Sequence, residues 1–336
     1  MPRISGTQPG NPGASGRFAA RRFATPAGAD GVLETVREET GALLPAMAEA
    51  RDRFMELVAE VRPELHRYCA RMTGSVFDGE DIVQDALAKA YYALGQMREP
   101  PNLRPWLFRI AHNAAMDALR RRERKNVELV PDLHDRAEPE GDEVDPSLVE
   151  AALTVFVELT PVQRGALILK DVLGHSLEET AATMDTSVGA VKAALSRARA
   201  NVARIPADTS PHARSVSEDR LTNLRRYADL FNDRDWKALR ALVGEESRLD
   251  QVSLVQRRME DARYFDRYAE IVPGEGIRAV PGLVDGVEVI AMFRPASSAD
   301  PAYFVLLKWT DGRISLVRDF RYVPYIGDEA RFSAIT

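Results

Sequence analysis

The sequence predicts a multidomain protein with two all-α domains followed by an α+β domain. Apolar residues recur at helical spacing in two separate stretches, residues 52–125 and 160–204. Runs rich in β-branched and aromatic residues come only after residue 286, and short helices precede them. Helices followed by an antiparallel sheet are typical of an α+β domain, which we expect to curl into a cone.

Composition sets the expected boundaries between these parts. The first residues are rich in Gly, Ala, Pro and Arg without sustained periodicity, and two later segments contain prolines and lack an apolar face. The expected order is a mostly disordered extension (1–50), a helical domain (51–125), an acidic linker (126–147), a second helical domain (148–205), a linker (206–217) and the α+β domain (218–330).

The most informative helix is expected from Arg104 to Lys125. Its buried stripe consists of Leu107, Ile110, Ala111, Ala114 and Ala118. The opposite face gathers basic residues in a chain whose net charge is −6. Guanidinium groups suit phosphates, and an Asn amide can pair with a base edge, so this face is a candidate nucleic-acid surface. The alternative is a solvated helix whose basic end complements the helix dipole.

The flanking sequence resembles a known family. DGEDIVQDALAKAYYAL, from Asp78 to Leu94, followed by RPWLFRIAHNAAMDALRRRER, resembles region 2 of the sigma-70 family of bacterial transcription initiation factors, in its extracytoplasmic-function (ECF) group. The resemblance implies that the first motif binds core RNA polymerase, through Asp78, Asp81, Ile82, Gln84 and Asp85. It implies that the second binds the minus-ten promoter element, through Arg109, Asn113, Asp117, Arg120, Arg121 and Arg124, with Asn113 where relatives hold a flipped base.

The second helical domain has the pattern of a helix-turn-helix. Thr160 with Gln163 and Ser176 with Glu179 predict two capping boxes, Gly174 predicts a helix end, and Asp185 to Ser187 predicts a tight turn. The last helix carries basic residues and no acidic one. A plain helical bundle is the alternative.

This segment resembles region 4 of the same family. The resemblance implies recognition of the minus-35 promoter element by residues of the last helix and its cap: Ser187, Lys192, Ala193, Ser196, Arg197 and Arg199. The two resemblances together make promoter DNA and core polymerase the expected partners.

The α+β domain is expected to begin with helices over Leu221 to Val243, broken at Asn232 to Asp235. Strands are expected at Val287–Phe293, Tyr303–Trp309 and Ile314–Val323, with a hairpin turn at Asp311-Gly312. Tyr227–Val243 and Asp311–Tyr322 resemble the SnoaL-like branch of the nuclear transport factor 2 superfamily. That resemblance implies a cone that contacts the sigma core and tunes it in cis. The alternative is a bifunctional protein whose C-terminal part binds a small ligand or is a cyclase- or isomerase-type enzyme.

Composition argues against several other classes of protein. Asp250, Tyr264, Asp266 and Asp319 are the available acid–base groups of the last domain, which has no histidine, and we expect no enzyme and no catalytic residue. The scattered histidines and the single Cys69, expected in the core, predict neither a metal site, a cofactor nor a disulfide. No run approaches the ~20 apolar residues that cross a bilayer, and no cleavable signal is evident, so we expect a cytoplasmic bacterial factor.

Overall fold

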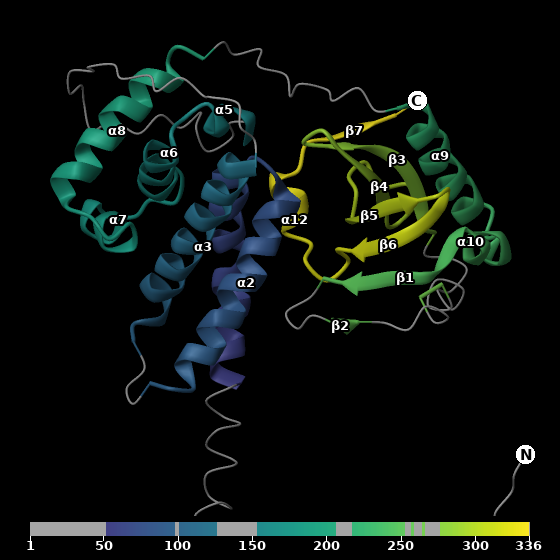
Figure 1. Cartoon of the computed structure of the whole chain (residues 1–336), viewed down its shortest axis with the longest axis horizontal. Coiled ribbons are helices and arrows are strands. Elements are labelled where there is room, and N and C mark those ends of the chain that lie inside the picture. Colours follow the sequence, from purple (N-terminus) through teal and green to yellow (C-terminus); the bar gives the residue numbers. More distant parts are fainter. Residues whose placement is uncertain are drawn as a thin grey trace, which may run out of the picture. The chain divides into compact units, whose positions relative to one another are not determined.

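A computed structural model describes residues 52–97, 101–125, 153–205, 217–252, 257–258, 264–265 and 276–335 (Figure 1). The predicted N-terminal extension, the acidic linker and nearly all of the second linker lie outside these ranges, as does Asp266. The chain divides into two compact units, residues 1–55 and 56–336, and every contact described below lies within the second.

The first helical domain contains a helix over residues 52–73, α2 (Val76–Leu94) and α3 (Leu103–Lys125). Gly74, with φ of 75°, ends the first helix, and the Ser75 side chain accepts a hydrogen bond from the Asp78 amide and so caps α2. Gly79 then packs against the Ala70 backbone, which a Cβ at position 79 would approach to 2.6 Å. This close approach brings α2 directly onto the preceding helix.

The stripe predicted for α3 is largely confirmed. Leu107, Ala111 and Ala114 are buried, while Ile110 and Ala118 are half-buried. A second buried row, consisting of Phe108, His112 and Ala115, was not predicted. Part of this row faces the second helical domain, because the Phe108 ring contacts His175 and the His112 ring lies beside Gly165.

The second helical domain forms the expected helix-turn-helix. It consists of α5 (Leu153–Val157), α6 (Pro161–Leu167), the π-helical turn η1 (Ile168–Val172), α7 (Leu177–Thr183) and α8 (Val188–Val202). The capping box of Ser176 and Glu179 is confirmed, and Asp185 occupies the tight turn with φ of 53°. The capping box at Thr160 was wrong, because its hydroxyl caps nothing and Gln163 is buried, accepting a hydrogen bond from Asn201.

The C-terminal part begins with α9 (Glu218–Asn232) and α10 (Trp236–Leu242), as predicted. Their sheet has the strand order β2-β1-β6-β5-β4-β3-β7, in which only the β1–β6 pair is parallel. The strands are β1 (Val243–Gln251), β2 (Arg257–Arg258), β3 (Arg278–Val284), β4 (Val287–Phe293), β5 (Tyr303–Thr310), β6 (Arg313–Asp319) and β7 (Phe332–Ala334).

The predicted hairpin at Asp311-Gly312 is confirmed, with positive φ at both residues. The strand predicted to reach Val323 instead ends at Asp319, because the chain turns there and the Val323 amide bonds the Phe320 carbonyl. Beyond this turn lies the short helix α12 (Ile326–Glu329).

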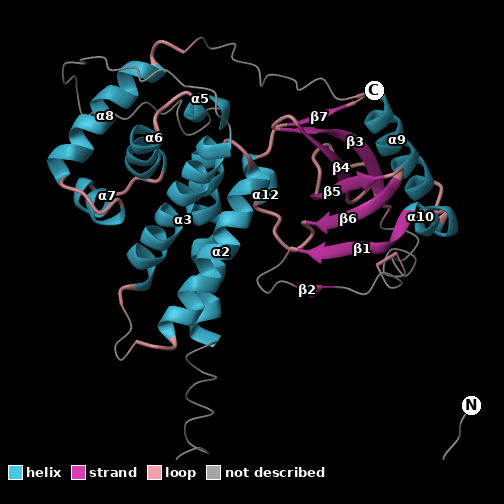
Figure 2. Ribbon diagram, viewed as in Figure 1, coloured by secondary structure: helices cyan, strands magenta, loops and turns pink. Residues whose placement is uncertain are grey.

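Both faces of the sheet are buried against helices. On one face, α9 and α10 pack onto alternate residues such as Ile290, Met292 and Val305 (Figure 2). On the other face, Val289, Ala291 and Phe304 belong to a core that also contains Phe77 of α2. The Phe77 ring lies 4.9 Å from the Phe320 ring and 6.2 Å from the Phe304 ring. The start of α2 therefore shares one hydrophobic core with the sheet.

We predict that Phe77→Ala lowers the free energy of unfolding by about 3 kcal/mol, because it removes a buried ring and leaves a cavity between α2 and the sheet. Urea unfolding followed by circular dichroism measures the change. Tyr92→Ala on the same helix is the control, because its ring is 73% exposed and its loss should change stability by only about 0.5 kcal/mol. Equal effects of the two substitutions would contradict this packing.

Candidate nucleic-acid interface

The residues predicted to meet the minus-ten element all lie exposed on α3. They are Arg109, Asn113, Asp117, Arg120, Arg121 and Arg124. Spacings of three and four residues place most of them on one face, with Arg121 at its edge. Asp117 binds Arg120 at 2.9 Å, so the one carboxylate of the set is paired with a neighbouring cation. The face is therefore a basic surface with a single exposed amide, that of Asn113.

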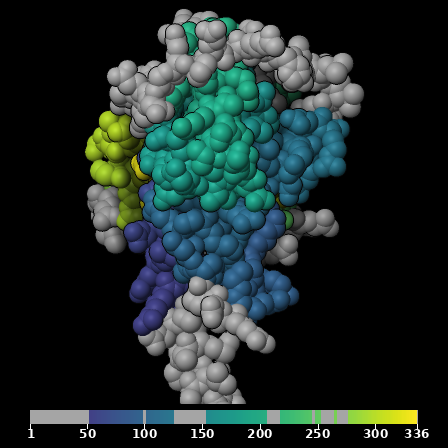
Figure 3. Space-filling model, turned by 90° about the vertical axis from the view of Figure 1, so that its left-hand side faces the viewer, coloured from purple at the N-terminus to yellow at the C-terminus, as the bar shows by residue number. Residues whose placement is uncertain are grey.

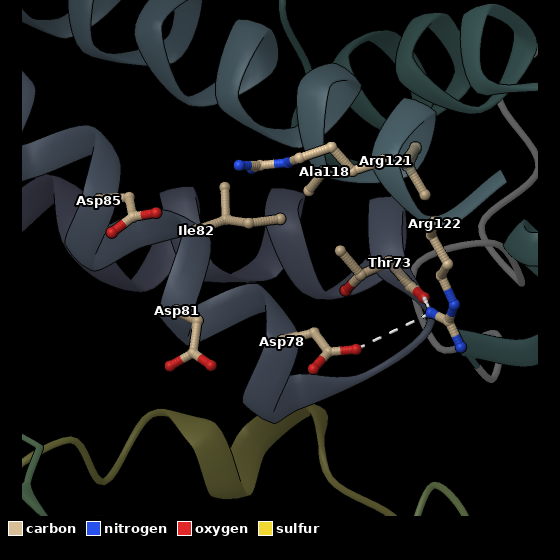
Figure 4. Close-up of a pocket in the computed structure, with 9 residues that line it drawn as sticks. Thr73, Asp78, Asp81, Ile82, Asp85, Ala118, Arg121 and Arg122 are labelled. Carbon is tan, nitrogen blue, oxygen red and sulfur yellow. Dashed lines mark hydrogen bonds and ion pairs between the residues drawn. The ribbon is translucent and has the colours of Figure 1, made fainter. Parts of the chain in front are cut away.

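A groove of about 220 Å³ lies between α2 and the C-terminal half of α3 (Figure 4). Three carboxylates of α2, Asp78, Asp81 and Asp85, line one side, and Arg121 and Arg122 of α3 line the other. We call this the charged groove; its apolar lining consists of Ile82, Ala118 and Leu119. Arg121, predicted to bind DNA, thus lies in a groove with the residues predicted to bind polymerase.

Charges within the charged groove are partly paired. Arg122 lies 3.8 Å from the Asp78 carboxylate. Burial raises the pKa of Asp78, and Arg122 opposes that rise. Among these carboxylates, Asp85 is therefore more accessible than Asp78 to a positively charged partner that approaches α2.

The polymerase-binding set predicted on α2 does not lie on one exposed face. Asp78, Asp81 and Asp85 are exposed. Ile82 is buried, and Gln84 is half-buried and donates a hydrogen bond of 3.2 Å to Glu80. The exposed members of the predicted set are therefore three carboxylates, Asp78, Asp81 and Asp85, spaced about one turn apart. Such a row suits a basic partner.

The residues predicted to meet the minus-35 element divide into two groups. Lys192, Ala193 and Arg197 are exposed on α8, Ser196 is half-buried, and Ser187 caps the helix by accepting from the Ala190 amide at 3.2 Å. Arg199 points inward instead. Its guanidinium donates hydrogen bonds of 2.9 and 2.8 Å to the carboxylate of Asp171, which is buried in η1.

This bidentate pair assigns Arg199 a structural role, because the buried Asp171 carboxylate needs a cation. The sequence signal was a lone acid within the apolar run ALILKDVL, which the helix-turn-helix pattern alone did not use.

The two helical domains contact each other through buried polar groups. Arg164 of α6 donates to the Met72 carbonyl of the first domain and to the Val157 and Leu159 carbonyls of its own. The Tyr68 hydroxyl and His112 Nδ1, which lie 2.6 Å apart within the first domain, border Gly165 of α6. Figure 3 shows teal residues of the second domain against blue residues of the first. Burial lowers the pKa of His112 to about 4, so this ring is neutral at pH 7 and packs within the protein.

Residues 318–329 contact the start of α2 and the helix that precedes it, which no sequence pattern indicated. Arg318 donates two hydrogen bonds to Asp81, and Tyr325 donates one of 2.9 Å to Glu80. Arg62 donates to both Glu80 and Tyr325. Glu329 of α12 accepts from Arg67 and Arg71. We call these contacts the α2 junction; its residues are Arg62, Arg67, Arg71, Glu80, Asp81, Arg318, Tyr325 and Glu329.

The electrostatics of the α2 junction favour its ion pairs. Burial pulls the pKa of Arg62 down, but Glu80 and Tyr325 outweigh it, so the net shift is upward and the guanidinium stays charged. Burial and the Glu80 carboxylate raise the pKa of Tyr325 and keep its hydroxyl protonated as a donor. Burial lowers the pKa of nearby His66. The inner part of the α2 junction is thus a fixed pair of opposite charges with a neutral tyrosine and histidine beside it.

The acid–base candidates of the C-terminal part are engaged in local contacts. Asp250 accepts from Arg248 at 2.7 Å, and Asp319 accepts from the Arg321 amide at 2.9 Å. Tyr264 is buried in the core between the sheet and α9. Within the described ranges there is no cluster of His, Cys, Asp and Glu suited to a metal ion. None of the described helices is long and apolar enough to span a bilayer.

Two family models match the helical parts of the chain. Sigma-70 region 2 matches residues 57–125, and sigma-70 region 4 matches residues 150–202. A solved structure with a similar chain is that of the sigma factor RpoE in complex with the anti-sigma factor NepR from Bartonella quintana. It is 27% identical, covers 45% of this chain and 94% of that one, and has a TM-score of 0.35.

Curated relatives extend the similarity. The ECF RNA polymerase sigma factor SigG of Mycobacterium tuberculosis is 33% identical over 239 residues, which are 59% of this chain and 61% of SigG. The chain therefore spans about three fifths of the length of SigG. SigM of Mycobacterium tuberculosis is 32% identical over 173 residues, which are 50% of this chain and 85% of SigM. With both sigma-70 regions present in order and most of SigM covered, the chain belongs to the family of ECF RNA polymerase sigma factors.

Proposed function

We propose that this protein binds core RNA polymerase and directs it to specific promoters, and that it works in the cytoplasm with that enzyme. The observation that carries the proposal is the presence of two separate exposed basic helix faces, on α3 and α8, in the order of regions 2 and 4. The α3 face would meet the minus-ten element, and α8 would enter the major groove at the minus-35 element.

The α3 face suits strand capture. A protein that hydrolyses no nucleotide can hold DNA open only by binding unstacked bases, and opening requires a few kcal/mol for each base. Asn113 offers an amide that can pair with a base edge, while Arg109, Arg120 and Arg124 surround it with charge for phosphates. Asn113 is therefore the base-binding residue of the proposal, and the arginines position the strand.

We infer that the C-terminal part is a SnoaL-like cone that tunes the sigma core in cis. The observation in favour is the core shared by Phe77 and the sheet, together with the ion pairs of Arg71 with Glu329 and of Asp81 with Arg318. Breaking a buried ion pair by removing one partner typically costs about 3–5 kcal/mol. Contacts of this kind support a lasting intramolecular association.

The alternative, a ligand-binding or enzymatic C-terminal part, receives less support. The space between the sheet and α9 is occupied by side chains that are at most 8% exposed, among them Tyr227, Phe231 and Phe265. Burial raises the pKa of the Tyr227 hydroxyl, which suits a packed residue better than an acid catalyst. An interaction role fits this filled interior.

The proposal is tested by in vitro transcription from a genomic fragment library with bacterial core polymerase and the full chain. We expect defined transcripts from a small set of enriched fragments. Asn113→Ala should reduce strand opening about tenfold, because an amide that pairs with a base edge contributes about 1–3 kcal/mol. Its affinity for polymerase should not change. Permanganate footprinting measures opening, and a fluorescence titration measures affinity.

Asp85→Ala is the matched variant for polymerase binding. It should weaken binding by about threefold, the value of an exposed ion pair, and leave opening by the saturated complex intact. Asp85 is preferred to Asp81 because Arg318 already binds Asp81, so that removing Asp81 would change two interactions. Loss of both properties in both variants would mean that the two faces are wrongly assigned, and absence of any defined transcript would refute the function.

A second prediction separates the two arginines of α8. Arg197→Ala should weaken minus-35 binding about tenfold and make it less dependent on salt, because one cationic contact to DNA is lost. Arg199→Ala should instead lower the melting temperature, because Asp171 would remain buried and unpaired. Fluorescence anisotropy over a salt series and thermal unfolding measure the two effects. The reverse assignment of effects would refute the geometry described for α8.

A further inference from the structure

One carboxylate of the charged groove is held by the C-terminal part of the same chain. Arg318 donates through both terminal nitrogens to the two oxygens of Asp81, a fork geometry that suits a carboxylate. The Asp81 side chain is 49% exposed, whereas that of Arg318 is 15% exposed. The pair thus lies at the solvent edge of the α2 junction, with the acid open to an outside partner and the arginine enclosed.

The surroundings of Arg318 fix its orientation. Its guanidinium carbon lies 5.3 Å from the centre of the Phe320 ring, and Phe320 packs on Phe77. Burial alone would lower its pKa, but Asp81, Asp250 and Glu80 raise it overall. Arg318 is therefore a permanent cation held against α2 by the core beneath it.

We propose that Arg318 competes with core polymerase for the Asp81 carboxylate, so that the C-terminal part weakens polymerase docking at one defined ion pair. This inference rests on the proposed function, because it takes the acidic row of α2 as the docking surface. A basic side chain is the partner that a row of carboxylates selects, and Arg318 already occupies that position at Asp81.

The arrangement allows local competition without separation of the domains. The inner contacts that join the two parts are the ion pair of Arg71 with Glu329, whose side chains are at most 7% exposed, and the hydrogen bond from Tyr325 to Glu80. Asp78 and Asp85 remain exposed beside Asp81. A docking partner can therefore bind Asp78 and Asp85 first and then displace the Arg318 guanidinium from Asp81.

The test is a titration of full-length chain with bacterial core polymerase, without DNA. Arg318→Ala should bind about three- to tenfold more tightly than the unaltered chain, the range for a partly exposed bidentate pair. Arg318→Lys should show a smaller gain, because an ammonium group keeps the charge without the fork. Arg313→Ala is the control, since Arg313 is an exposed arginine of the same strand and should leave affinity unchanged.

A double-mutant cycle ties the effect to Asp81. In an Asp81→Ala background the Arg318→Ala substitution should no longer change polymerase affinity, because the contested carboxylate is gone. Unchanged or weaker binding of Arg318→Ala, or an equal gain in both backgrounds, would overturn the competition while leaving the sigma activity intact. Failure of the unaltered chain to bind core polymerase at all would instead refute the proposed function on which this inference rests.

Discussion

The insertion of Phe77 into the face of the C-terminal sheet is the contact on which the rest of this architecture depends. The ring packs between Phe304 and Phe320, and the helix that carries it starts only two residues after Gly74. Because α2 is a rigid rod beyond that point, fixing its first turn also fixes its carboxylates. Asp81, one turn further, then meets Arg318, and Glu80 meets Arg62 and Tyr325. A single apolar anchor thereby aligns Asp81 with Arg318 and Glu80 with Tyr325.

The ion pairs of this interface differ in burial and therefore in strength. The buried pair of Arg71 with Glu329 adds little net stability over an apolar core, but an arrangement that leaves either partner unpaired is strongly disfavoured. An exposed pair such as Arg318 with Asp81 is weak and can be exchanged for another partner. The same interface therefore contains buried contacts that are specific and lasting, and one exposed ion pair that another partner can replace. That combination is what a domain needs if it is to regulate a docking surface without being released from it.

Local patterns predicted most elements, and contacts between distant segments account for what they missed. The break between α9 and α10 and the Asp311-Gly312 turn are properties of short stretches and were confirmed, and the apolar spacing of α3 was confirmed for most of its stripe. The second buried row of α3 and the inward turn of Arg199 depend on neighbours dozens of residues away. One clue was available: β4 reads VEVIAMF, apolar on both faces, which indicates that both sides of the sheet are covered. The sequence does not say that α2 provides the second cover, because the partner of an apolar face is a property of the fold. The roles of the α3, α8 and α2 residues in binding DNA and polymerase remain predictions.

We propose that one helix, α2, serves both the C-terminal part and polymerase. Hydrogen–deuterium exchange of the full chain, with and without core polymerase, tests it most directly. We expect polymerase binding to speed exchange around Arg318, whose side chain loses Asp81. Exchange around Tyr325 and Glu329, and in α9 on the opposite face of the sheet, should stay the same because the inner contacts are kept. Unchanged or slower exchange around Arg318 in a saturated complex would contradict the competition, because Arg318 would then keep Asp81 while polymerase is bound. Faster exchange throughout residues 318–329 would also contradict it, because the inner contacts would then be lost as well.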